Sequence, residues 1–230
     1  MSRIVIWSGG YDSTLLLHRE LQDHKEATAW SFIMPGISQH KLHSEHVVRE
    51  RYKKYMQETL SKFKLSHQVI NIGYDNFNNI PEGCFSQQTF WTLFSAWFAP
   101  KDSTIIFGFH KGDDFWRMHE KVDWMRTYIE QIMEKKITFE YPLQCTPKWQ
   151  IVHDIKNYGL EENVWTCENP PIPMSECGEC TTCTILRQAK SEIEYRLKNN
   201  LLSEPEPVKA EEKMTVDAAD VIVDPASEKK

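Results

Sequence analysis

The segment Ser8-Gly9-Gly10-Tyr11-Asp12-Ser13-Thr14 combines two glycines with aliphatic hydroxyls and a carboxylate. It follows an apolar run at residues 4–7 and precedes a helical pattern at residues 15–21. Glycines let a backbone approach an anion closely, and hydroxyls, free N–H groups and the positive end of a helix dipole can bind it. The segment is not the P-loop of kinases, because no lysine follows it and the glycine spacing differs. It therefore predicts a phosphate-binding turn of another type; the alternative is a turn that only joins a strand to a helix.

A cysteine cluster near the C-terminal end is the second group that could do chemistry. Three of the six cysteines form a C-x-x-C-x-x-C pattern, and a fourth lies ten positions upstream. Four thiolates at such spacing predict a tetrahedral zinc site without an open position, so the metal would be structural. An iron–sulfur cluster accepts the same ligands and stays open as the alternative. The predicted metal ligands are Cys167, Cys177, Cys180 and Cys183, whereas Cys84 and Cys145 are expected to be core or surface thiols.

Alternating β-rich and helical segments must position these groups. After the first strand, β-rich runs occupy residues 28–34, 67–72 and 104–109, and helices are expected at 44–63, 87–98, 124–135, 148–158 and 184–198. This alternation predicts an α/β fold, Rossmann-like, with a parallel sheet and helices on both faces. Ligands of such sheets sit beyond the carboxyl ends of the strands. The phosphate turn and the segments after Met34 and Phe109 should therefore converge on one cleft.

Two of the expected helices carry further predictions. The helix at 44–63 has Ser44 as a candidate cap and a basic face formed by Arg49, Arg51, Lys53 and Lys54. The helix at 87–98 repeats aromatic residues at helical spacing, namely Phe90, Trp91, Phe94 and Trp97. We expect this aromatic stripe to pack in the core; stacking on a ligand is the alternative.

Length and charge set the organisation of the chain. Its 230 residues predict a nucleotide-binding domain at 1–145, a helical metal-binding region at 146–200 and a disordered acidic tail at 201–230. Residues 203–230 carry eight acids and four lysines, so most of the net charge of −6 lies in the tail. A negative net charge argues against a sequence-independent grip on nucleic acid, so direct nucleic-acid binding is not expected. Because the folded part is near neutral, the net charge says little else about the ligand. No apolar run approaches the roughly 20 residues of a membrane span, and no signal peptide precedes the first strand, so a cytoplasmic protein is expected.

Five motifs together resemble a known family. They are SGGYDST at 8–14, GFHKGDDF at 108–115, ITFEYPL at 137–143 followed by Pro147-Lys148, and WTCENP and CGECTTC within 165–183. Their order and spacing resemble the 7-cyano-7-deazaguanine synthase (QueC) family of the PP-loop ATP pyrophosphatase superfamily, over residues 1 to about 200. The resemblance implies an adenine nucleotide alpha hydrolase-like fold.

The resemblance also implies an activity. Family members are ligases that convert 7-carboxy-7-deazaguanine and ammonia to the nitrile through adenylated intermediates, with two ATP, for queuosine or deazaguanine-modified nucleic acid. ATP, Mg²⁺ and Zn²⁺ are the implied cofactors, and a homodimer is an implied assembly. The implied partners are a small deazapurine and ammonia.

The resemblance assigns roles to individual residues. ATP would be held by Ser8, Gly9, Gly10, Asp12, Ser13 and Thr14. Asp12 would position Mg²⁺ or orient the turn, with a helix cap as the alternative, and Lys111 and Lys148 would act with it in catalysis. The deazapurine or its carboxylate would be bound by Asp114, Arg117, Glu120 and Asp123, with Asp113 as a further candidate.

Two segments depart from the family pattern. Residues 34–41 lack the YGQxH-like sequence of the family, and residues 81–88 lack the Arg-Asn pair of its PGRN segment. Because these segments shape the substrate pocket in the family, two other hypotheses stay open. One is a QueC-like adenylating enzyme with a protein or nucleic-acid acceptor in a defence or modification pathway. The other is a catalytically inactive nucleotide-binding module.

Overall fold

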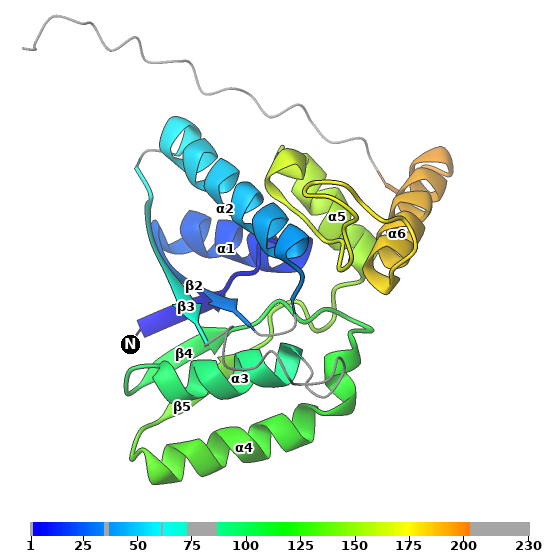
Figure 1. Cartoon of the computed structure of the whole chain (residues 1–230). Helices are drawn as coiled ribbons and strands as arrows, with labels where there is room; N and C mark the ends of the chain where they lie inside the picture. Colours follow the sequence, from blue (N-terminus) through cyan, green and yellow to red (C-terminus); the bar gives the residue numbers. More distant parts are fainter. Residues whose placement is uncertain (1, 35–36, 61, 73–86, 203–230) are drawn as a thin grey trace, which may run out of the picture.

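Five parallel strands form the single sheet of the computed structural model, which describes residues 2–34, 37–60, 62–72 and 87–202 (Figure 1). The strand order is β3-β2-β1-β4-β5. The predicted parallel sheet is confirmed, although no strand had been expected at β5. The strands are β1 (Ser2–Ile6), β2 (Glu26–Ile33), β3 (Lys64–Asn71), β4 (Ser103–Ile106) and β5 (Ile137–Glu140).

Helices cover both faces of the sheet, as predicted. One hydrophobic core joins α1, α2, α5 and α6 to one face, and a second joins α3 and α4 to the other (Figure 1). Successive residues of β1 alternate between the cores, because Val5 contributes to the first and Ile4 and Ile6 to the second. The helices are α1 (Tyr11–His24), α2 (Gln39–Thr59), α3 (Gln87–Phe98), α4 (His119–Ile132), α5 (Lys148–Asn157) and α6 (Thr181–Lys198), with short 3-10 turns at Asp114–Arg117 and Glu161–Asn163.

The direction of the chain reverses between β1 and β4. From β1 the chain moves outward through β2 to β3, then returns to β4 on the other side of β1 and continues to β5. Neighbouring strands whose connections leave in opposite directions open a crevice at their carboxyl ends. The phosphate turn follows β1 and GFHKGDDF follows β4, so both motifs lie at this crevice.

The start of α2 differs from the prediction. The helix begins at Gln39, and its cap is Ser38, whose hydroxyl accepts a hydrogen bond from the Lys41 amide at 3.2 Å. The expectation that Ser44 is the cap was wrong, because Ser38 offers a cap six residues earlier. Ser44 is buried within the helix, where it donates to the His40 carbonyl at 2.8 Å and accepts from the Met174 amide at 2.8 Å.

Two other helix starts also differ from the prediction. The helix predicted at 87–98 has these bounds as α3, whereas α4 and α6 begin earlier than expected, at His119 and Thr181. Arg49, which was assigned from the sequence to the basic face of α2, is only 5% exposed. The domain division remains a prediction, and both Cys84 and residues 203–230 of the expected tail lie outside the described residues. None of the described helices has the length and apolar character of a membrane span.

Candidate functional site

A cavity of about 610 Å³ opens at the crevice between β1 and β4. Its walls come from the phosphate turn, the loop after β4, the starts of α2, α3 and α5, and the segment that carries the cysteines. The predicted convergence of the first and third loops on one cleft is therefore seen in the structure. The residues that line the cavity include Ser8, Gly10, Asp12, Ser13, Lys41, Glu45, Gln88, Trp91, Gly108, His110, Asp113, Asp114, Lys148, Trp165, Glu168, Thr181 and Thr182.

The phosphate turn packs closely against its neighbours. Gly9 has a φ of +94°, and a Cβ placed there would lie 2.9 Å from Val48 Cγ2 of α2. On the other side, a Cβ on Gly108 would lie 3.0 Å from the Ser13 amide nitrogen. Both glycines are thus required by a close approach of backbone to neighbouring atoms.

Two of the three predicted hydroxyls meet at the cavity. The Ser8 and Ser13 hydroxyl oxygens lie 3.1 Å apart, and Ser8 Oγ also accepts a hydrogen bond from the Gly10 amide at 3.2 Å. Thr14, in contrast, is fully buried, and its hydroxyl accepts a hydrogen bond from Trp7 Nε1 at 3.0 Å. The structure does not bring Thr14 to the cavity, because its hydroxyl is bonded to Trp7 in the core.

Asp12 and Lys148, which both line the cavity, form an ion pair. Lys148 Nζ lies 2.5 Å from Asp12 Oδ2, which joins the first turn of α1 to the first residue of α5. Asp12 Oδ1 is buried and has no hydrogen-bond partner among the described residues. A buried carboxylate oxygen without a donor is costly, and a cation or a donor from a ligand would satisfy it.

Asp113, on the loop after β4, also lines the cavity. Its carboxylate accepts hydrogen bonds from the Phe115 amide at 2.9 Å and from Gln88 Nε2 at 3.1 Å. Burial raises the pKa of Asp113, and the nearby negative charge of Asp12 also raises it, while the Phe115 amide opposes the change. The carboxylates of Asp12 and Asp113 are therefore close enough to repel each other electrostatically.

Several residues implied by the resemblance lie elsewhere. Lys111 is exposed and does not line the cavity. Arg117 is 86% exposed and points toward Asp114, 3.7 Å away. Glu120 and Asp123 are exposed, and Asp123 pairs with Arg126 at 2.8 Å. Of the four predicted substrate-binding residues, Asp114 alone lines the cavity.

A buried ionic cluster on α2 was missed. Lys41, Glu45 and Arg49 follow one another at helical spacing, and each is less than 10% exposed. Lys41 pairs with Glu168 and lies 3.8 Å from Glu45, which in turn lies 3.5 Å from Arg49. Burial raises the pKa of Glu45, and the two cations oppose this change. The spacing of four was the only signal in the sequence, and it is also typical of a solvated helix face.

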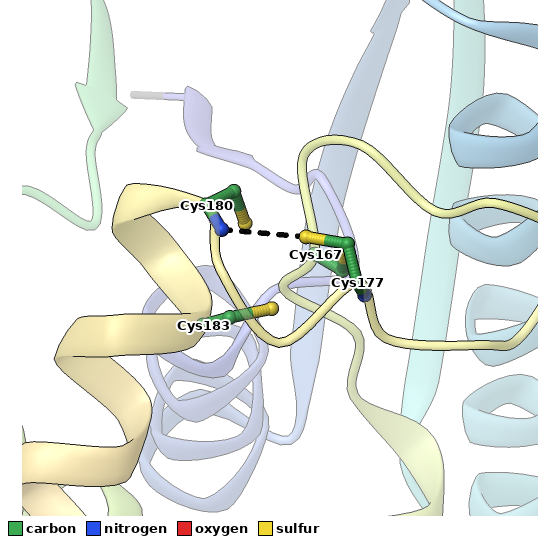
Figure 2. Close-up of side chains that lie close together, drawn as sticks. All are labelled: Cys167, Cys177, Cys180 and Cys183. Atoms are coloured by element: carbon green, nitrogen blue, oxygen red, sulfur yellow. Dashed lines mark hydrogen bonds between the residues drawn. The ribbon is translucent and has the colours of Figure 1, made fainter.

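The four predicted metal ligands converge, and Figure 2 shows their side chains turned toward one another. Their sulfur atoms all lie within 4.8 Å of one another. Backbone amides support the thiols, because the Cys177 amide donates to Cys167 Sγ and the Cys180 amide to Cys177 Sγ, each at 3.3 Å. Burial acts to raise the pKa of Cys180, but hydrogen bonds from Thr182 and backbone amides bring it to about 6. The donor set can therefore hold a metal ion.

The cysteine-bearing segment also forms a wall of the cavity. The Trp165 amide donates to the Gly9 carbonyl at 2.9 Å, and Glu168 pairs with Lys41. The Met174 amide bonds to Ser44 of α2. The cluster of cysteines and the phosphate turn thus share one connected set of contacts.

Comparison with known proteins supports the resemblance. Residues 96–194 match the family model described as queuosine biosynthesis protein QueC. The fold is similar to that of a U34-tRNA thiolase, NcsA from Methanococcus maripaludis, solved with its [4Fe-4S] cluster. That match has a TM-score of 0.50 and 13% identity, and it covers 86% of this chain and 67% of the thiolase chain. No curated protein sequence matches the chain.

These comparisons agree with the site. The family match confirms the predicted resemblance over its C-terminal motifs, and the structural match confirms the Rossmann-like fold. The phosphate turn lies at the switch point of this fold and lines the cavity.

Proposed function

We propose that the protein is an ATP-dependent 7-cyano-7-deazaguanine synthase, which forms the nitrile from 7-carboxy-7-deazaguanine and ammonia. The observation that carries the proposal is the phosphate turn at the crevice, with Ser8 and Ser13 facing the cavity beside the Asp12–Lys148 pair. The match of residues 96–194 to the QueC model supports the choice of reaction.

Adenylation explains why such a site is needed. A carboxylate is a poor electrophile, so its oxygen first attacks the α-phosphorus of ATP and releases pyrophosphate. Ammonia then displaces AMP to give the amide. The amide oxygen attacks the α-phosphorus of a second ATP and pyrophosphate again departs. Loss of AMP and of the two protons of the amide nitrogen then leaves the nitrile. The enzyme must hold the leaving diphosphate and align the acid with the α-phosphorus.

The cavity residues divide this work. Ser8, Ser13 and the Gly10 region would hold the diphosphate at the positive end of α1. Lys148 would move from Asp12 toward the phosphates and offset their charge. The unpartnered Asp12 Oδ1 fits a Mg²⁺ ion, which would stabilise the charge of the leaving diphosphate. Asp113 and Asp114 would accept hydrogen bonds from a purine-like ring.

The four cysteines would hold zinc. In a tetrahedral site with metal–sulfur bonds of about 2.3 Å, four thiolates around one ion lie close together. In a four-iron cluster each thiolate binds a different iron, so the sulfur atoms stand farther apart. Sulfur atoms within 4.8 Å of one another favour a single ion. Elemental analysis of the purified chain should find about one zinc per chain and no iron; a brown protein with visible absorption would contradict zinc.

One assay tests the proposed reaction. The purified chain, incubated with 7-carboxy-7-deazaguanine, ATP, Mg²⁺ and ammonium, should release AMP and form the nitrile, followed by mass spectrometry. Asp12→Asn should slow AMP release by about a hundredfold or more, because it weakens the charge balance at the diphosphate. Asp23→Asn, an exposed change at the other end of α1, is the matched control and should leave the rate unchanged. ATP turnover that does not depend on the acid would argue against this reaction.

A different acceptor is the second candidate function. It is favoured by the positions of Arg117, Glu120 and Asp123, which are exposed and away from the cavity. The departures at residues 34–41 and 81–88 point the same way, although residues 35–36 and 73–86 lie outside the described residues. Incubation with cell extract and ATP, followed by intact-mass analysis, would reveal an adenylated or amidated macromolecule. If the protein releases no AMP with any of a panel of carboxylated deazapurines, this candidate is favoured over the first.

Sulfur transfer is less well supported than ligation. The structural neighbour is a tRNA thiolase, but no described cysteine of this chain lines the cavity. The four clustered cysteines lie together at the candidate metal site, and Cys145 is exposed. A thiolase reaction would need a sulfur-carrying group within reach of the adenylated atom.

A further inference from the structure

Arg49 lies beneath the phosphate turn, on the face of α2 that packs against it. Arg49 Nη1 donates a hydrogen bond of 2.7 Å to the Ser8 carbonyl, and the Arg49 side chain is only 5% exposed. Arg49 does not line the cavity. Its guanidinium lies 3.5 Å from the buried Glu45, which compensates its charge. The ion pair with Glu45 therefore allows the guanidinium to stay buried against the Ser8 carbonyl.

Each of the three carbonyls of the turn accepts a hydrogen bond from a group of the protein. The Ser8 carbonyl accepts from Arg49, the Gly9 carbonyl from the Trp165 amide at 2.9 Å, and the Gly10 carbonyl from the Thr14 amide at 3.0 Å. Only the last of these is an ordinary helix bond. The first two are tertiary contacts, made by α2 and by the segment that carries the cysteines.

These hydrogen bonds determine whether backbone N–H groups or carbonyl oxygens of the turn face a bound anion. A carbonyl oxygen carries partial negative charge, and it would repel a phosphate if it were turned into the cavity. The peptide links around Gly9 and Gly10 can rotate at low cost, because glycine lacks the side chain that restricts other residues. Without an anchor the Ser8–Gly9 link is therefore free to present its oxygen to the phosphates.

We infer that Arg49 is a positioning residue for diphosphate binding: it holds the Ser8 carbonyl out of the cavity without contacting the nucleotide. The inference rests on the proposed binding of ATP at the turn. Glu45 keeps the guanidinium in place, and the Trp165 amide performs the same task for Gly9.

The orientation of this peptide link can be observed without any ligand. Ser8-Gly9 is the only Ser-Gly pair in the sequence, so labelling serine with ¹³C at the carbonyl and glycine with ¹⁵N gives a single NMR signal from this link. In Arg49→Met the carbonyl signal should shift and broaden, because its charged donor is lost. In Arg51→Met, the matched change at an exposed arginine of the same helix, it should stay in place. An unchanged signal in folded Arg49→Met would overturn the inference.

Pyrophosphate binding provides the second measurement. By calorimetry of the full chain with Mg²⁺, Arg49→Met should weaken pyrophosphate binding by about tenfold or more, as expected for a lost hydrogen bond to a charged group. Arg49→Lys should recover part of the affinity, and Arg51→Met should bind within about twofold of the natural chain. Equal affinity in Arg49→Met and the natural chain would refute the role of Arg49 and leave the proposed function intact.

Two further outcomes are decisive. If the natural chain binds neither pyrophosphate nor ATP, the proposed function fails and this inference fails with it. If Arg49→Met does not fold, Arg49→Lys takes its place, because it keeps the charge that compensates Glu45. A shifted Ser8–Gly9 signal with weaker pyrophosphate binding in Arg49→Lys would then support the inference. Natural values for both in Arg49→Lys would overturn it.

Discussion

Gly9 and Gly112 both adopt left-handed backbone conformations, with φ of +94° and +87°, but their surroundings differ. A Cβ on Gly9 would lie 2.9 Å from Val48 Cγ2, whereas a Cβ on Gly112 would have no heavy atom within 4 Å. An alanine at Gly112 would therefore suffer only from the unfavourable φ, whereas an alanine at Gly9 would also clash with neighbouring atoms. The requirement at Gly9 comes from the packing of the phosphate turn on α2.

This contrast yields a prediction at the scale of a residue. Gly112→Ala should lower the free energy of unfolding by about 1 kcal/mol, the usual cost of a left-handed conformation. Gly9→Ala carries the same strain plus a clash within a packed core, so its loss should be about 2–4 kcal/mol. Urea denaturation of both variants measures the difference. Equal losses would mean that the turn does not rest on Val48 in solution.

At the scale of elements, the site could be predicted where chemistry is carried by a contiguous motif. SGGYDST placed Asp12, Ser8 and Ser13 at the cavity, and the cysteine spacing placed all four thiols together. Lys41 and Arg49 could not be predicted, because a buried charged cluster has the same helical spacing as a solvated face. Strand β5 was missed because it is only four residues long and three of them are half-buried, which leaves little apolar signal.

The start of α2 gives a prediction at this scale. Ser38→Ala removes the hydroxyl that accepts from the Lys41 amide, so the free energy of unfolding should fall by about 1 kcal/mol. Ser38→Asp retains a capping oxygen and should stay close to the natural chain. Thermal or urea denaturation of the two variants measures this. Equal destabilisation by alanine and aspartate would show that capping is not the role of Ser38.

For the whole molecule, the strand order fixes where the pieces of the site can meet. The reversal between β1 and β4 opens the crevice. Helices α2 and α5 and the cysteine segment, which lie on one side of the sheet in Figure 1, contribute residues to the cavity there. The core beneath this side contains His18 of α1, whose Nδ1 lies 3.2 Å from the Tyr52 hydroxyl of α2. Its ring also lies 4.6 Å from the Tyr158 ring, beyond α5. Protonation of His18 would therefore place a charge where three helical segments meet.

His18 thus links the stability of the whole fold to pH. Burial lowers the pKa of His18 to about 4, and the charge of Arg19 adds to this, whereas an unfolded histidine titrates near about 6.5. The unfolded chain then binds the proton more tightly, so stability is full above the unfolded pKa and falls as pH drops toward the folded pKa. Between pH 7 and pH 5 this residue should account for a loss of about 2 kcal/mol.

A variant isolates this contribution. In His18→Phe the ring stays apolar at every pH, so its free energy of unfolding should fall by about 2 kcal/mol less between pH 7 and pH 5 than that of the natural chain. His67, whose pKa burial also lowers to about 4, and the thiols titrate in both proteins, so their contributions cancel in the comparison. Urea denaturation at the two pH values measures the difference. Parallel losses in the two proteins would show that His18 is already hydrated or charged in the folded state.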